Sequence, residues 1–161
     1  MTVEVRTARS EDWPALFTLW VDAWTAFLPA IDFAARLPWF RGYVAELQRR
    51  GAVALAAVED GAPLGFVTVD ALRQEMDQLV TAPAVQRRGI GRRLLRGAKE
   101  RSPGGLTLKV VQNNQPAIEL YLDERFIITG EGVSERSGLP TFSMRWRGLG
   151  SDQAEVRSRA R

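Results

Sequence analysis

Cysteine and histidine are both absent from this chain of 161 residues. Without cysteine there is no disulfide framework and no thiol nucleophile, and without histidine there is no Ser-His-Asp triad. A zinc site that needs thiolate or imidazole ligands is excluded for the same reason. Chemistry is therefore left to carboxylates, hydroxyls and the backbone, and no metal cofactor is expected.

Long uncharged apolar runs are missing as well. A membrane-spanning helix needs about 18 such residues, and no stretch of this sequence approaches that length. The first strand-like segment, Thr2 to Ala8, carries Glu4 and Arg6 and does not fit a secretory signal. The sequence predicts neither a membrane partner nor export, and the expected location is the cytoplasm.

A strong excess of charge of either sign is also lacking. The 22 Lys and Arg residues oppose 19 Asp and Glu residues, so the formal net charge is only +3, and 45% of the residues are hydrophobic. This balance fits one globular domain with an ordinary core and gives no general attraction to nucleic acid. We expect the domain to span residues 1–147, with residues 148–161 as a flexible polar tail.

The order of the patterns that are present predicts an α/β protein. Helices are indicated by apolar residues at three- and four-residue spacing, and strands by alternation or by β-branched and aromatic runs. The predicted strands are 2–8, 52–58, 64–72, 75–82, 106–112, 127–133 and 140–147, and the predicted helices are 10–28, 32–50, 89–101 and 116–125. A break near Pro38 is expected in the second helix.

The crossover from Glu75 to Arg96 carries the clearest chemical signal, because its helix begins within the pair Gly89 and Gly91. The first amides of a helix have no internal partner, the helix dipole is positive there, and glycines allow a phosphate to approach closely. The pair therefore predicts a site for a phosphate or a pyrophosphate. Leu94 stands where a Rossmann fingerprint needs a third glycine, and the Gly-Lys-Ser or Gly-Lys-Thr of a P-loop is absent.

A second motif follows the next predicted strand: Asn114-x-x-Ala117-x-x-x-Tyr121, with Phe126 five residues further on. Together with the glycine loop it resembles the Gcn5-related N-acetyltransferase (GNAT) superfamily, most specifically from Met76 to Phe126. The resemblance implies a single-domain GNAT-like fold with a central mixed, mostly antiparallel sheet of about seven strands flanked by about four helices. It also implies that acetyl-CoA is the cosubstrate.

Carried over position by position, the resemblance assigns roles to residues of this chain. Leu79, Val80 and Thr81 would pair through their backbone with the pantetheine arm. The residues that would hold the phosphates are Arg87, Arg88, Gly89, Ile90, Gly91 and Arg92. Asn114 would contact the cofactor further along, and Tyr121 would protonate the departing thiolate. A phenol pKa near 10 is close enough to a thiol pKa near 8.5 for this transfer.

The general base is expected to be Glu75 or Asp77. Strand alternation predicts that both carboxylates share one face with Leu79 and Thr81, from which a water could relay the proton of the acceptor amine. GNAT enzymes that modify the ribosomal alanine N-terminus use a glutamate where this chain has Lys109. That departure argues against the same base and the same substrate.

Each assignment has a plainer alternative. Tyr121 could be a core tyrosine, because its spacing from Ala117 also suits packing, and the two carboxylates could be solvated strand residues. The arginines between residues 87 and 96 could form a nucleic-acid footprint, but no aromatic residues are interleaved with them. The favoured interpretation of these arginines is a solvated helix face, and the second is a clamp for the phosphates. Arg125, where the family usually has glycine, changes a helix C-cap.

Aromatic residues concentrate in the two predicted N-terminal helices, and most of them should be core. In the resembling family the loop between these helices covers the acceptor pocket. This implies that substrate is bound by Trp24, Phe27, Leu28 and Pro29, and the further candidates are Phe33, Trp39 and Tyr43. Such a pocket suits an apolar acceptor or, through cation–π attraction, a positively charged amine.

We therefore expect an acetyl-CoA-dependent N-acetyltransferase that acts on a primary amine of a small molecule by direct attack in a ternary complex. The alternatives are a protein or peptide acceptor and a non-catalytic acyl-CoA-binding module. The expected assembly is a monomer or a homodimer, with neither nucleic acid nor a membrane as partner.

Overall fold

The computed structural model of the chain describes residues 2–86 and 88–160. In this part of the chain one seven-stranded sheet has the order β1-β2-β3-β4-β5-β7-β6. The strands are β1 (Glu4–Thr7), β2 (Val53–Glu59), β3 (Ala62–Asp70), β4 (Glu75–Thr81), β5 (Leu106–Val111), β6 (Ile127–Val133) and β7 (Pro140–Trp146). The helices are α1 (Trp13–Phe27), α2 (Phe33–Arg49), α3 (Ile90–Arg101), α4 (Gln115–Asp123) and α5 (Leu149–Arg159). The predicted α/β architecture is confirmed, and among the described strands only β4 and β5 pair in parallel.

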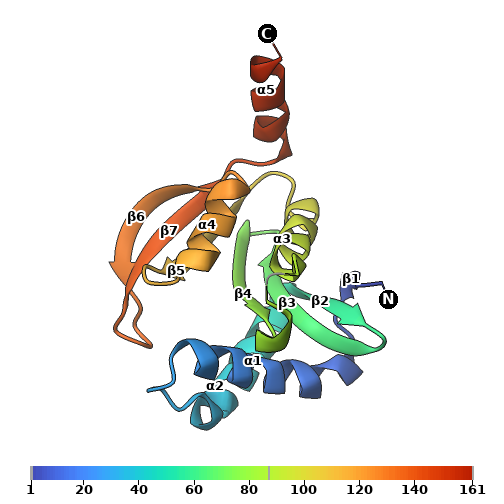
Figure 1. Cartoon of the computed structure of the whole chain (residues 1–161), viewed down its shortest axis with the longest axis vertical. Coiled ribbons are helices and arrows are strands. Elements are labelled where there is room, and N and C mark those ends of the chain that lie inside the picture. Colours follow the sequence, from blue (N-terminus) through green and yellow to red (C-terminus); the bar gives the residue numbers. More distant parts are fainter. Residues whose placement is uncertain (1, 87, 161) are drawn as a thin grey trace.

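Helices α1 and α2 cover one face of the sheet (Figure 1). Their apolar stripes bury Leu16, Trp20 and Phe40 against Phe66 of β3 and Val80 of β4. Trp20 and Phe40 stack with ring centroids 4.2 Å apart, which ties α1 to α2. Aromatic packing therefore fixes the two helices that stand over β4.

Helices α3 and α4 lie on the other face. The period of α3 turns Leu94, Leu95 and Ala98 into the core, while Ile118 and Tyr121 enter it from α4. This second core continues under β5 and β7. The start of α3 and one face of α4 are thereby held beside the ends of β4 and β5.

β4 and β5 separate directly after their parallel pairing begins. Their parallel pairing consists of Glu75 and Thr107. Each strand then continues with its antiparallel neighbour, β4 with β3 as far as Thr81 and β5 with β7 as far as Val111. In the described structure the edge of β4 that faces β5 has no strand partner over Gln78–Thr81. We call this opening the wedge.

A β-bulge interrupts β4 beside the wedge. Phe66 of β3 pairs with Val80, but Thr68 pairs with Asp77, so β4 holds one more residue than β3 over this stretch. Gln78 takes up the extra length with a left-handed φ of +53°.

The bulge makes the expected alternation along β4 wrong. The side chains of Asp77 and Gln78 both face the α1–α2 side, where they accept hydrogen bonds from Tyr43 and Trp20 respectively. Leu79 packs instead against the core on the α3 side. Because the extra residue reverses the alternation, the Asp77 carboxylate does not share a face with Leu79.

Two helical segments differ from expectation. α2 continues through Pro38 without a break, because Phe33 and Phe40 anchor it in the core on both sides of the proline. Residues 148–161, expected as a flexible polar tail, contain α5, which projects from the sheet in Figure 1. Asp152 of α5 accepts a hydrogen bond from Nε1 of Trp146 at 3.0 Å. Among the described helices, none has the length and hydropathy to cross a bilayer.

Candidate cofactor and acceptor site

The start of α3 forms a cradle of backbone amides at the wedge. Gly89 precedes the first turn with φ +78°, and in the described structure no side chain caps this end of the helix. The first bond back into the helix runs from the Arg93 amide to the Gly89 carbonyl, 3.1 Å. Among the described residues, no backbone acceptor pairs with the amides from Gly89 to Arg92, so these amides are available to an anion at the positive end of the helix dipole.

The shape of the cradle leaves room for a ligand. A Cβ atom placed on Gly89 would meet no atom within 4 Å, so the space in front of this backbone is open. A Cβ atom on Gly91 would lie 3.4 Å from Leu120 of α4 and 3.9 Å from Thr81 of β4. The cradle thus lies between α4 and the end of β4, the strand that borders the wedge.

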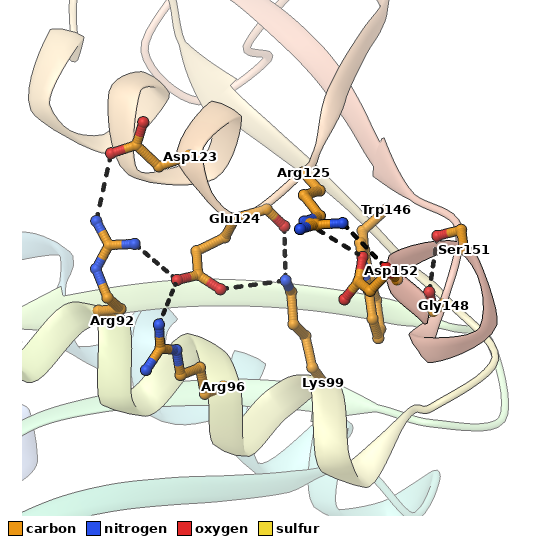
Figure 2. A network of polar contacts seen from close by, with 10 residues as sticks. All are labelled: Arg92, Arg96, Lys99, Asp123, Glu124, Arg125, Trp146, Gly148, Ser151 and Asp152. Atoms are coloured by element: carbon orange, nitrogen blue, oxygen red, sulfur yellow. Dashed lines mark hydrogen bonds and ion pairs between the residues drawn. The ribbon is translucent and has the colours of Figure 1, made fainter. Parts of the chain in front are cut away.

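The arginine side chains near the cradle make ion pairs within the protein. Arg88 pairs with Glu59 at 2.8 Å, and Arg87 lies outside the described residues. Arg92 turns away to Glu124 and Asp123, at 2.7 and 3.3 Å (Figure 2). The two described arginines that were expected to hold the phosphates are thus engaged in ion pairs, which leaves the backbone amides beside them for a phosphate.

Arg92 belongs to a network around the buried carboxylate of Glu124 (Figure 2). Arg96 reaches the same oxygen, Oε1, at 3.3 Å, and Lys99 bonds Oε2 at 3.2 Å and the Glu124 carbonyl at 2.6 Å. Burial alone would raise the pKa of Glu124, but the hydrogen bonds from Arg92 and Lys99 and the charges of Lys99 and Arg96 outweigh it and lower the pKa. The network ties α3 to the end of α4.

Tyr121 is 6% exposed and packs against Phe126, with ring centroids 5.6 Å apart. Its hydroxyl forms no hydrogen bond with the described residues. Burial first, and then the charge of Asp77, raises the pKa of this hydroxyl above its usual range. Tyr121 is both a core residue and a neutral phenol with a free proton to donate.

Of the two carboxylates, the structure brings Asp77 toward Tyr121. Oδ2 of Asp77 accepts a hydrogen bond from the Tyr43 hydroxyl, and Oδ1 accepts one from the Gln78 amide at 2.8 Å. Glu75 lies at the start of β4, with 53% of its side chain exposed and its carboxylate 4.0 Å from Arg50. Asp77 is therefore the better placed of the two to take a proton.

Asn114 stands at the N-cap of α4, directly after β5. Its Oδ1 accepts a hydrogen bond from the Ala117 amide at 3.4 Å. The side chain therefore caps the start of α4. The same position places it just after β5, on the β5 side of the wedge.

A pocket of about 330 Å³ opens on the α1–α2 side of β4. It is bordered by both N-terminal helices, β4, β5 and the β6–β7 loop. Its lining residues are Trp20, Trp24, Leu28, Phe33, Arg36, Trp39, Gln78, Val111, Ser134, Arg136 and Ser137. Trp24 and Leu28, expected to bind substrate, line it. Phe27 is not among the lining residues and packs against the Trp24 ring, with centroids 6.0 Å apart.

Several lining residues escape sequence reasoning. Gln78 enters the pocket because of the bulge, and its Oε1 is fixed by Nε1 of Trp20 at 2.9 Å. Arg136 comes from a polar loop that has no motif. In the described chain no group of three or more acidic, cysteine or histidine side chains gathers as a metal site would require.

Comparison with known proteins gives this geometry a context. The Acetyltransferase (GNAT) family matches residues 13–125. The chain is 34% identical over 146 residues to the peptidyl-lysine N-acetyltransferase YiaC of Escherichia coli, covering 88% of this chain and 95% of that protein. It is 29% identical over 143 residues to the peptidyl-lysine N-acetyltransferase YjaB of Escherichia coli, covering 87% and 92%.

Solved structures show the same fold. The solution structure of apo-form YjaB from Escherichia coli has a TM-score of 0.66 at 28% identity, covering 92% of this chain and all (100%) of that one. The structure of yncA from Salmonella typhimurium with its cofactor acetyl-CoA has a TM-score of 0.65 at 20% identity, covering 91% of this chain and 94% of that one.

Proposed function

The chain belongs to the GNAT family of acetyltransferases, and from this premise we propose that it transfers the acetyl group of acetyl-CoA to the ε-amine of a lysine in a protein or peptide. The observation that carries the acceptor class is the similarity to YiaC along 88% of the chain. This reading replaces the small-molecule amine as the first choice of acceptor, and a small amine stays as the second candidate.

Acetyl-CoA has a suitable place in the wedge. The amides at the start of α3, from Gly89 to Arg92, would bind its pyrophosphate, supported by the open space in front of Gly89. The pantetheine arm would hydrogen-bond to the edge of β4 over Leu79–Thr81, which lacks a strand partner on that side. Asn114 would lie alongside the arm from the α4 side.

The chemistry needs a base and an acid, because the acceptor amine is mostly protonated at neutral pH. Asp77, directly or through a water, would take the proton that the ammonium loses. The neutral amine nitrogen then forms a bond to the acetyl carbon and releases its second proton to solvent as the carbon–sulfur bond breaks. Tyr121 would give its hydroxyl proton to the departing sulfur and recover one from solvent. No acyl-enzyme is proposed, since the chain has no cysteine.

The pocket suits a lysine side chain. Its aliphatic stem can pack along Trp24 and Leu28, while the aromatic rings attract the ammonium group before the proton is lost. A small aromatic or aliphatic amine is the second candidate, favoured by the enclosure of the pocket between two helices and the β6–β7 loop.

One experiment tests the reaction and the acceptor together. The purified chain is incubated with acetyl-CoA and, separately, with lysine peptides, peptides with a free N-terminus, and free amines. CoA release and the mass of each acceptor are measured. We expect acetylation of lysine side chains. Acetylation of free amines alone would select the second candidate, and acetyl-CoA binding without transfer to any acceptor would indicate a non-catalytic binding module.

A further inference from the structure

Two arginines line the acceptor pocket without an acidic partner. Arg36 comes from α2, and Arg136 comes from the β6–β7 loop. Within the described residues neither guanidinium forms an ion pair, whereas Arg88 and Arg92 near the cradle both do. A charge that has no counter-ion in the protein and lies on a ligand pocket is a candidate for ligand recognition.

Both guanidinium groups are held in place by other contacts. Nη1 of Arg36 donates to the backbone carbonyl of Arg136 at 3.4 Å, which joins α2 to the β6–β7 loop. The Arg136 guanidinium lies over the ring of Trp39, 4.1 Å from its centroid, and 5.1 Å from that of Tyr43. Stacking of this kind fixes the plane of a guanidinium and leaves its N–H edge available.

We propose that Arg36 and Arg136 bind a carboxylate that the acceptor carries near its reactive amine. The inference rests on the proposed function and names the kind of lysine that the enzyme selects. For a peptide, the carboxylate is an aspartate or glutamate next to the acetylated lysine, or the carboxyl group of a C-terminal lysine.

The spacing of the site fits an acceptor with both charges. The Tyr43 ring carries Arg136 on its face, and its hydroxyl bonds to Asp77, where the amine loses its proton. One tyrosine side chain thus separates the two charged ends of the site. A lysine side chain has a comparable reach, so its amine can lie at Asp77 while a neighbouring carboxylate lies at the two arginines.

The same two charges disfavour other acceptors. A lysine flanked by arginine or lysine would bring positive charge toward Arg36 and Arg136, and this repulsion would not be offset within the described structure. The pair therefore selects between lysines by attraction in an acidic context and by repulsion in a basic one.

The test uses matched peptides, each with one lysine and blocked ends. Glutamate is compared with glutamine at each position from two before to two after the lysine, and kcat/KM is measured for each pair. In at least one position glutamate should raise kcat/KM by about tenfold, as expected for a charge-assisted contact at a partly exposed site. A C-terminal lysine is compared with its amide in the same way.

Variants assign the effect to the two arginines. Arg36→Gln and Arg136→Gln should each bring the ratio of kcat/KM for the glutamate peptide to kcat/KM for the glutamine peptide toward one. The affinity for acetyl-CoA should be unchanged in both variants. Arg136→Glu should reverse it in favour of a basic neighbour. Arg41→Gln is the matched control, because Arg41 lies on the same helix but contacts Phe17 outside the pocket lining, and it should keep the preference.

The outcomes separate this inference from the proposed function. Equal kcat/KM for glutamate and glutamine peptides that are acetylated would overturn the carboxylate site and leave the lysine acceptor standing. If no peptide is acetylated but small amines are, the lysine acceptor is wrong, and free lysine is compared with lysine amide. Equal rates for that pair would overturn the carboxylate site as well, and a preference for free lysine that Arg136→Gln removes would retain it.

Discussion

The hydroxyl of Tyr43 donates a hydrogen bond to the carboxylate of Asp77, which joins α2 to the bulge in β4. With the Gln78 amide on its other oxygen, the Asp77 carboxylate has a fixed orientation next to Gln78, which lines the pocket. A base that is held in this way needs little reorganisation when it takes a proton.

Replacing this carboxylate should slow catalysis. Asp77→Asn keeps the shape and removes the base, so kcat/KM should fall by about a hundredfold with acetyl-CoA affinity nearly unchanged. Glu75→Gln is the matched control on the same strand and should stay within about twofold of the parent chain, because Glu75 is half-exposed and paired with Arg50. Steady-state kinetics with a lysine peptide measures both. A larger loss for Glu75→Gln would reverse the assignment.

The phenol of Tyr121 should matter for turnover and little for binding. Tyr121→Phe removes the proton donor without opening a cavity, so kcat should fall by about tenfold or more while the Kd for acetyl-CoA changes by less than about twofold. Because the raised pKa keeps this hydroxyl protonated, kcat of the parent chain should not fall between pH 7 and about pH 10 through loss of the Tyr121 proton. Unchanged turnover in the variant would leave Tyr121 with its packing role alone.

Glycine at the cradle should be required for cofactor binding. Gly89→Val forces a β-branched residue into φ +78° and fills the open space in front of the amides. Gly61→Val is the matched control, because Gly61 has φ +79° and equally open surroundings at the β2–β3 turn. Both variants should lose about 1–2 kcal/mol of stability, but calorimetry should show lost acetyl-CoA binding only for Gly89→Val. Equal binding by the two variants would contradict the cradle.

The Glu124 network should make stability depend on acid pH. Glu124→Gln leaves Lys99 buried without its ion-pair partner and should cost about 3 kcal/mol of unfolding free energy at pH 7. The folded pKa of Glu124 lies below its unfolded value of about 4.3, so the carboxylate stabilises the fold fully above that value and stops doing so as the pH falls through the folded pKa. Urea unfolding should therefore show a smaller difference between the two chains near pH 3.

An exposed glutamate of the same helix provides the control for that effect. Glu119→Gln on α4 should change stability by less than about 0.5 kcal/mol at either pH, since Glu119 is exposed to solvent. A constant loss for Glu124→Gln across the acid range would mean that shape and packing, rather than charge, stabilise this corner.

The fold follows from signals that are local in the sequence. Apolar periodicity places α1 and α3, and alternation with turn residues places the hairpin of β2 and β3. The cradle at Gly89 and Gly91 is also local, because a helix start and two glycines suffice to predict it. Pro38 misleads for a physical reason, since packing of the aromatic residues around it outweighs one lost hydrogen bond.

The acceptor side could not be predicted in the same way. The bulge has no glycine to mark it, because Gln78 itself takes the left-handed conformation, and the faces of Asp77 and Leu79 depend on it. Arg36 and Arg136 are 100 residues apart and meet only through tertiary structure. Arg125 likewise adopts φ +70° where a glycine is the usual signal.

In the described structure, the pairing of Glu75 with Thr107 is the only ladder contact that joins β1–β4 to β5–β7. On each side of the opening the strands keep an antiparallel neighbour, β4 with β3 across the bulge and β5 with β7. A ligand that hydrogen-bonds to the unpaired edge of β4 would bridge the opening between β4 and β5. Ligand binding would therefore make the central sheet more rigid. The melting temperature of the chain would then rise with the concentration of that ligand.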